Sequence, residues 1–289
     1  MSTLSRRLAL FLAAAAFTAP VAAHAQTLRT FTRTDAKGEV TIAATVRGKG
    51  PLVVLVPSLG RGASDFDDLA ARLAAAGFQV AAVDPRGVGQ SRGPSEGVTM
   101  FDLADDFGMV GRGLSDKPAV YIGHAHGNRI VRALASRRPE QVSRLILLAA
   151  GGQVKMEPEV QTALQNVFVE TLTPQQHLVA VKTAFFAPGN DPSVWRGGWY
   201  PAVATEQTAA GAATPNGEWL DGGHAPILIV QAANDRVAAP ANAEALKRAH
   251  PDRVTVVTIP DAGHAMLPEQ PKLIADIVIG YLKSVGPPR

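Results

Sequence analysis

The sequence predicts an α/β protein with a mostly parallel central sheet and helices on both faces. Strand-like and helix-like patterns alternate along most of the chain, which is typical of parallel βαβ units. Leu52–Val56, "LVVLV", is a continuous apolar run, as expected of a strand buried on both faces. A length of 289 residues, 46% of them hydrophobic, fits one globular domain with a small insertion.

The first 25 residues are expected to be a cleaved export signal. Arg6 and Arg7 precede the apolar run Leu8–Phe17, and Ala23–Ala25, "AHA", offers small residues for cleavage. A membrane anchor is the alternative, but the run is shorter than the roughly 20 apolar residues that span a bilayer. The mature protein is then exported, periplasmic or secreted, by the general or the twin-arginine route, with no membrane segment left.

Composition excludes several classes of function. The chain has no cysteine, so disulfides, thiolate catalysis and thiolate metal ligands are excluded. Loss of residues 1–25 removes two arginines and no acid, which leaves 26 basic against 25 acidic side chains. Because the charge is nearly balanced and no dense basic run is present, we expect no nucleic-acid partner.

The elements follow one another in a regular order after the signal. A hairpin is expected from Leu28–Thr34 and Val40–Val46 around "DAKGE". Further strands are expected at Leu52–Val56, Val80–Val83, Ala119–Ile122, Leu145–Ala149, Ile227–Ala232 and Val254–Ile259. Helices are expected at Asp65–Ala76, Phe101–Leu114, Asn128–Arg137, Ala241–His250 and Ile274–Val285.

The alternation breaks between residues 151 and 223. This stretch is rich in Gly, Pro, Trp and Asn, with weakly helical segments such as Val160–Leu172. The sequence therefore predicts a core of residues 26–150 and 224–289 with an inserted lid at 151–223.

Two loops at the carboxyl ends of predicted strands carry glycines. In Pro57–Ser64, "PSLGRGAS", the glycines let backbone N–H groups turn toward a developing negative charge, although an ordinary strand-to-helix turn is the favoured interpretation of the loop taken alone. In Asp84–Ser91, "DPRGVGQS", we expect a tight turn held by Asp84 and Arg86.

A third loop has the outline of a nucleophile turn. In Tyr121–Val131, "YIGHAHGNRIV", Gly123 and Gly127 flank Ala125. A residue between two glycines on a strand-to-helix turn is exposed and strained, and the next N–H is free to bind an oxyanion. Downstream, Asp235 and then His264 follow successive predicted strands, the order of the acid and base in a nucleophile–acid–base arrangement.

Taken together, "DPRGVGQS", "GHAHG", the "ND" pair and "DAGH" resemble the α/β-hydrolase superfamily from about Arg29 to the C-terminus. The resemblance implies that His264 is the general base, Asp235 its orienting acid, and Leu59 and His126 the donors of the oxyanion-hole amides. It also implies a small-molecule ester, lactone or similar carbonyl substrate, with no cofactor.

Two positions depart from the family pattern. Pro57 and Ser58 replace the usual "HG" of the oxyanion loop, and Ala125 stands at the nucleophile position. Ala125 is either natural or a laboratory substitution made to trap a substrate, and the retained export signal favours the natural origin. Ser58 could replace the nucleophile only within hydrogen-bond reach of His264.

Other residues near these loops are weaker candidates. His124 and His126 flank Ala125, but alternate residues on a sharp turn point apart, so no metal site is expected. Trp195 and Trp199 either shape an apolar ligand pocket or anchor the insertion. Arg61 either binds an anionic substrate group or forms a surface ion pair with a nearby aspartate, and the pair is favoured.

Four functional hypotheses remain open. The first is a hydrolase that uses His264 and Asp235 to activate water without a covalent intermediate. The second is a catalytically silent pseudoenzyme or small-molecule binder. The same base could also abstract a substrate proton, as in a lyase, an isomerase or a cofactor-free oxygenase. The last is a serine esterase inactivated at Ala125.

Overall fold

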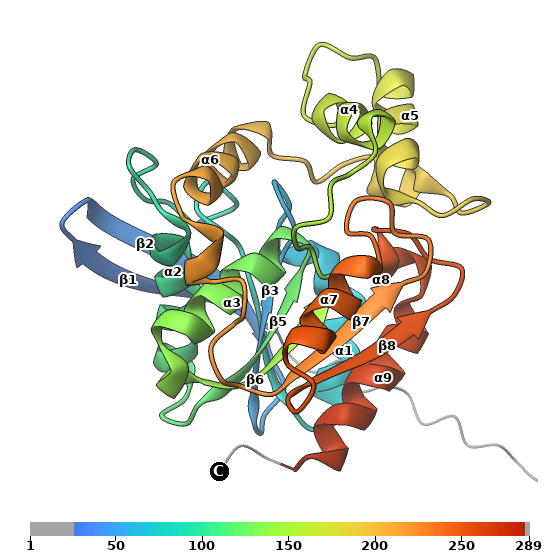
Figure 1. The fold of residues 1–289 in the computed structure, drawn as a ribbon. Helices are drawn as coiled ribbons and strands as arrows, with labels where there is room; N and C mark the ends of the chain where they lie inside the picture. The colour runs from blue at the N-terminus through green and yellow to red at the C-terminus, as the bar shows by residue number, and fades with distance from the viewer. Residues whose placement is uncertain (1–25, 287–289) are drawn as a thin grey trace, which may run out of the picture.

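The computed structural model describes residues 26–286 and contains one eight-stranded sheet in the order β1-β2-β4-β3-β5-β6-β7-β8 (Figure 1). The strands are β1 (Thr27–Asp35), β2 (Gly38–Arg47), β3 (Leu52–Val56), β4 (Gln79–Val83), β5 (Ala119–His124), β6 (Val142–Leu148), β7 (Ile227–Ala232) and β8 (Val254–Ile259). β2 is antiparallel to β1 and β4, and β4 onward is parallel. The predicted fold class is therefore confirmed.

Helices cover both faces of the sheet, with α2 (Met100–Leu114), α3 (His126–Arg137) and α7 (Ala241–Ala249) in one core layer and α1 (Asp67–Ala75) and α9 (Pro271–Ser284) in the other. β3 separates these layers and is buried along its whole length. Its uninterrupted apolar sequence follows from this, because side chains on both faces of the strand lie in a core.

The segment between β6 and β7 contains α4 (Pro158–Asn166), α5 (Pro174–Phe185) and α6 (Pro201–Ala212), which lie at the top of Figure 1. The helix expected over Val160–Leu172 ends at Asn166, and α5 and α6 were not predicted. A signal for α5 was present, because Thr173 and Gln176 form a capping box with Pro174 at the first helical position.

Short helical turns complete the connections: η1 (Ala63–Phe66), η2 (Pro139–Gln141), η3 (Pro192–Trp195), η4 (Asn216–Glu218) and α8 (Met266–Glu269). The expected export signal at 1–25 lies outside the described residues. Within residues 26–286, no helix is both long and apolar enough to cross a bilayer.

Candidate functional site

The turn from β5 into α3 holds Ala125 in a strained conformation. Its φ of 51° and ψ of −109° lie in a region that costs a non-glycine residue on the order of 1–3 kcal/mol. The flanking glycines are required by close packing. A Cβ on Gly123 would lie 2.4 Å from the carbonyl group of Gly127, and one on Gly127 would lie 2.2 Å from the Val56 oxygen. The tight turn predicted from "GHAHG" is thus present.

Asp235 and His264 form a buried pair after β7 and β8. The His264 Nδ1 lies 2.9 Å from Asp235 Oδ2 and 3.1 Å from Oδ1. Oδ1 also accepts the backbone N–H groups of Val237 and Ala238 at 2.9 and 2.7 Å. Because a carboxylate only accepts hydrogen bonds, Nδ1 carries the proton and Nε2 keeps its lone pair. Asp235 thus fixes the orientation of the His264 ring and leaves the lone pair of Nε2 free.

The loop of residues 57–64 is tied to the 151–223 segment through Gly60. The Gly60 N–H donates to Gln207 Oε1 at 2.9 Å, and its carbonyl accepts the Tyr200 N–H at 2.9 Å. Among the described residues, no hydrogen-bond acceptor pairs with the N–H of Leu59 or of His126. Both residues line the same cavity. These two amides are therefore available to an oxygen anion there.

The "DPRGVGQS" turn is hydrogen-bonded to the 57–64 loop. Asp84 accepts the Ala63 N–H at 2.8 Å, and its carbonyl accepts the Ser91 hydroxyl at 2.8 Å. Arg86 donates two hydrogen bonds to the buried Asp106, at 2.6 and 3.0 Å. The predicted structural role of Asp84 and Arg86 is confirmed, since Asp84 holds the backbone of Ala63 and Arg86 donates to the Pro94 carbonyl at 2.8 Å.

A cavity of about 460 Å³ opens above Ala125, between the sheet and the 151–223 segment. The predicted residues that the structure brings together on its walls are Ser58, Leu59, Ala125, His126 and His264. Further lining residues are Arg129, Met156, Leu164, Phe168, Phe185 and Gln207. Most of these additional side chains are apolar, so the cavity suits a small organic molecule.

Two histidines beside Ala125 are held neutral by burial. Burial and then the neighbouring His264 lower the pKa of His124 to about 3, while burial and the charge of Arg129 lower that of His126 to about 3. The His124 Nε2–H donates to the His264 carbonyl at 2.8 Å, so His124 holds the backbone of His264 in place. In residues 26–286, no three His, Asp or Glu side chains gather in an arrangement that could hold a metal ion.

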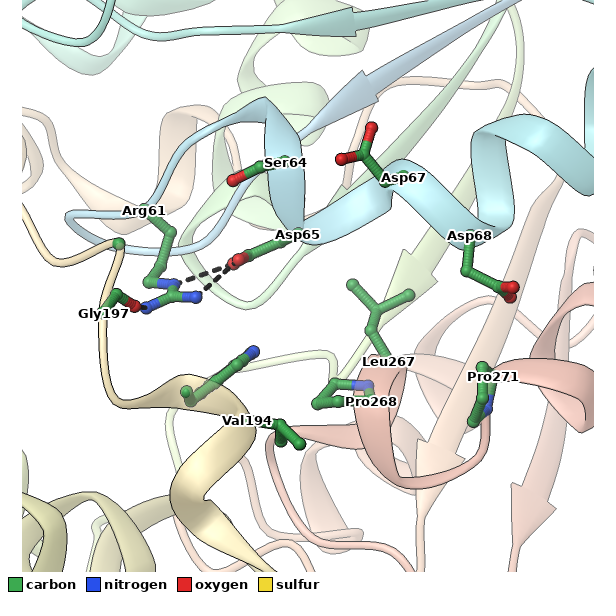
Figure 2. Close-up of a pocket in the computed structure, with 12 residues that line it drawn as sticks. Arg61, Ser64, Asp65, Asp67, Asp68, Val194, Gly197, Leu267, Pro268 and Pro271 are labelled. Carbon is green, nitrogen blue, oxygen red and sulfur yellow. Dashed lines mark hydrogen bonds and ion pairs between the residues drawn. The ribbon is translucent and has the colours of Figure 1, made fainter. Parts of the chain in front are cut away.

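Arg61 lies outside the cavity walls, in a separate pocket (Figure 2). It donates to both oxygens of Asp65, at 2.8 and 2.5 Å, and to the Gly197 carbonyl at 2.8 Å. The rings of Trp195 and Trp199 lie 4.6 and 4.3 Å from its guanidinium carbon. The favoured ion pair is present, but the expectation of a surface pair is wrong, since both partners are about 95% buried.

Trp195 and Trp199 are likewise absent from the walls of the cavity above Ala125. They pack instead on Phe185, with ring centroids 5.7 and 5.5 Å away. Phe185 in turn stacks on His264, with centroids 5.6 Å apart. This arrangement favours the anchoring alternative for the two tryptophans, because they pack against Phe185 and Arg61 rather than line the cavity.

Ser58 lines the cavity, but no hydrogen bond joins its hydroxyl to the ring of His264 in the described structure. A serine nucleophile needs its base within hydrogen-bond reach. The geometry therefore does not favour Ser58 as a substitute nucleophile.

Several cavity residues escaped the sequence reasoning, among them Arg129, Phe185 and Gln207. Arg129 lies in the first turn of α3, directly after the turn at Ala125. Its place at the start of the helix that follows the turn was a usable signal for Arg129. Phe185 and Gln207 belong to α5 and α6, which were not predicted. The capping box signals the start of α5, but it does not show which side chains of that helix face the cavity.

The sequence is similar to known hydrolases over most of its length. It is 24% identical to a 2-(acetamidomethylene)succinate hydrolase of Mesorhizobium japonicum, covering 85% of this chain and 92% of that protein. It is 28% identical to a monoacylglycerol lipase of Mycolicibacterium smegmatis, covering 81% and 88% of the two chains.

Solved structures share the same fold. A thermophilic esterase from Thermogutta terrifontis superposes with a TM-score of 0.73 at 24% identity, over 90% of this chain and 99% of that one. An esterase from Rhodococcus gives 0.75 at 20% identity, over 90% and 99%. The family model described as alpha/beta hydrolase fold matches residues 51–271. Sheet order, sequence and structural likeness agree, and the chain belongs to the α/β-hydrolase fold family.

Proposed function

We propose that this protein is an exported hydrolase of a small ester, lactone or similar carbonyl compound that works without a serine nucleophile. The observation that carries the proposal is the paired base, His264 with Asp235, on the same cavity as two unpaired backbone amides. Relatives named as a hydrolase and a lipase support a hydrolytic reaction. Export rests on the pattern of residues 1–25.

In this mechanism the methyl group of Ala125 leaves room for water where a nucleophile would stand. Water attacks the carbonyl carbon and gives a proton to His264 Nε2, while Asp235 stabilises the imidazolium. The N–H groups of Leu59 and His126 bind the oxyanion. The tetrahedral intermediate then expels the alcohol, which receives the proton back from Nε2.

The expected rate enhancement is modest. An oxyanion hole and substrate binding alone are worth roughly 10³–10⁴ over water in a triad enzyme that lacks its nucleophile. We further propose that Ala125 is natural and that residues 151–223 act as a lid over the 26–150 and 224–289 core. The bonds that Gln207 and Tyr200 make to Gly60 support that role, because they link this segment to the loop that would bind the oxyanion.

Multiple-turnover hydrolysis of an ester and lactone panel tests the proposal, with His264→Ala and Ala125→Ser measured in parallel. Turnover by the unaltered protein that disappears in His264→Ala is the expected result. Turnover that survives in His264→Ala would contradict base catalysis. The Ala125→Ser variant checks the choice of substrates, because it restores a nucleophile to an otherwise intact site.

A catalytically silent binder is the second candidate, and the methyl group at Ala125 favours it. It predicts saturable ligand binding that is indifferent to His264→Ala, with no turnover until Ala125→Ser is introduced. That last outcome is also expected of a serine esterase inactivated at this position. Proton abstraction from a substrate C–H by His264, as in a lyase, an isomerase or a cofactor-free oxygenase, predicts solvent deuterium exchange into the substrate without hydrolysis.

A further inference from the structure

Arg129 lies on α3 and lines the same cavity as Ala125, the N-cap residue just before that helix. Long helical side chains lean toward the helix N-terminus, which in α3 is the end at Ala125. The side chain of Arg129 therefore extends along the cavity wall toward the place where a substrate carbonyl would react.

No carboxylate neutralises Arg129 within residues 26–286. It takes part in no hydrogen bond or ion pair there, and no Asp or Glu lines the cavity. The Trp219 ring centroid lies 5.8 Å from its guanidinium carbon, the backbone at Gly151 is close to its nitrogens, and the charged group that shares the Trp219 ring is another cation, Arg132. Burial lowers its pKa, with no compensating acid.

Arg129 is partly buried, and the fully buried arginines among residues 26–286 all have hydrogen-bond partners. Arg61 and Arg86 each bind a buried aspartate through two nitrogens. Arg132, one turn further along α3, donates to the carbonyls of Gly151 and Leu220 and to Asn128. Removing a cation from water without such partners is costly, so the partly desolvated Arg129 is set apart by the absence of a protein acceptor among the described residues.

We infer that Arg129 binds a carboxylate of the substrate, which is then an ester or lactone that also carries a free acid a few bonds from the reacting carbonyl. A guanidinium matches a carboxylate with two parallel hydrogen bonds. The remaining wall residues, such as Leu164, Phe168 and Phe185, would contact the carbon chain. This inference rests on the proposed function for the reaction, but the binding of the acid does not depend on turnover.

Calorimetric binding of levulinate and of its neutral amide tests the inference. Both are ketones, so neither can be hydrolysed at the carbonyl that would occupy the oxyanion hole. Homologues with one and two more methylenes vary the spacing between the carboxylate and the ketone carbonyl. The proteins are the unaltered chain, Arg129→Gln and Arg129→Lys, with Arg137→Gln as the control on the same helix, since Arg137 is 44% exposed.

The expected result is that the unaltered protein binds at least one keto acid more tightly than its amide. Arg129→Gln should weaken binding of the keto acid by roughly 10- to 100-fold, the usual effect of losing a hydrogen bond to a charged group. It should leave the affinity for the amide unchanged. Arg129→Lys should recover part of the loss, and Arg137→Gln should change neither.

Equal affinity for acid and amide would overturn the inference, as would the absence of binding by any keto acid in the millimolar range. So would an equal loss for both ligands in Arg129→Gln, because that is what a merely structural arginine predicts. The proposed function fails separately. Acid-selective binding with turnover indifferent to His264→Ala would refute the base mechanism and leave the role of Arg129 intact.

Discussion

Replacing Asp235 with asparagine should move the ring proton of His264 from Nδ1 to Nε2. The backbone after β7, at Val237 and Ala238, should stay in place. Asparagine Oδ1 can still accept the N–H groups of Val237 and Ala238, now bonded at 2.9 and 2.7 Å. The Oδ2 atom, whose partner is His264 Nδ1 at 2.9 Å, becomes an NH₂ group. Because two donors cannot face each other, His264 should move its proton to Nε2.

The rate effect should be large and the stability effect smaller. General-base catalysis typically contributes about 10²–10⁴ to the rate, so a base whose lone pair faces the wrong way should lose about 2.7–5.4 kcal/mol of transition-state stabilisation. The lost hydrogen bond to a charged group is worth only about 1.5–3 kcal/mol of unfolding free energy. The variant should therefore stay folded and lose nearly all turnover.

Ring-nitrogen NMR of His264 tests the tautomer directly, and hydrolysis kinetics test its consequence. Asp252→Asn, an exposed change far from the pair, is the control and should alter neither. A protonated Nδ1 that persists in Asp235→Asn would refute the hydrogen-bond argument. A reversed tautomer with undiminished turnover would refute the role of His264 as base.

Two further predictions concern stability. Gly127→Ala should cost at least about 2 kcal/mol of unfolding free energy, because its Cβ would lie 2.2 Å from a backbone oxygen. Gly280→Ala, at an open helical position, should instead raise the unfolding free energy by about 1 kcal/mol. Equal effects of the two substitutions in urea unfolding would contradict this reasoning. Lowering the pH from about 7.5 to 5.5 should reduce the unfolding free energy by about 3 kcal/mol. The reason is that His124 and His126 have pKa values of about 3 in the folded protein. Only their unfolded forms therefore take up protons below pH ~6.5. A stability that stays flat over that range would show that these two histidines are not held neutral.

The sequence alone determined the architecture and the local turns. The period and order of apolar segments follow directly from burial in a parallel sheet, which is why strands such as Leu52–Val56 were recognised. The glycines at 123 and 127 and the order of Asp235 and His264 identified the arrangement of the site, since each depends on short-range geometry or on position after a strand.

Only the tertiary structure decided what each charged side chain faces. The sequence could not show that Arg61 is enclosed by Asp65 and two tryptophans from the distant 151–223 segment. Nor could it show that Arg129 lines the same cavity as Ala125, or that no carboxylate is among the lining residues of that cavity. The physical reason is that the partners of a buried charge come from segments far apart in the chain, and their approach depends on packing that local periodicity does not encode.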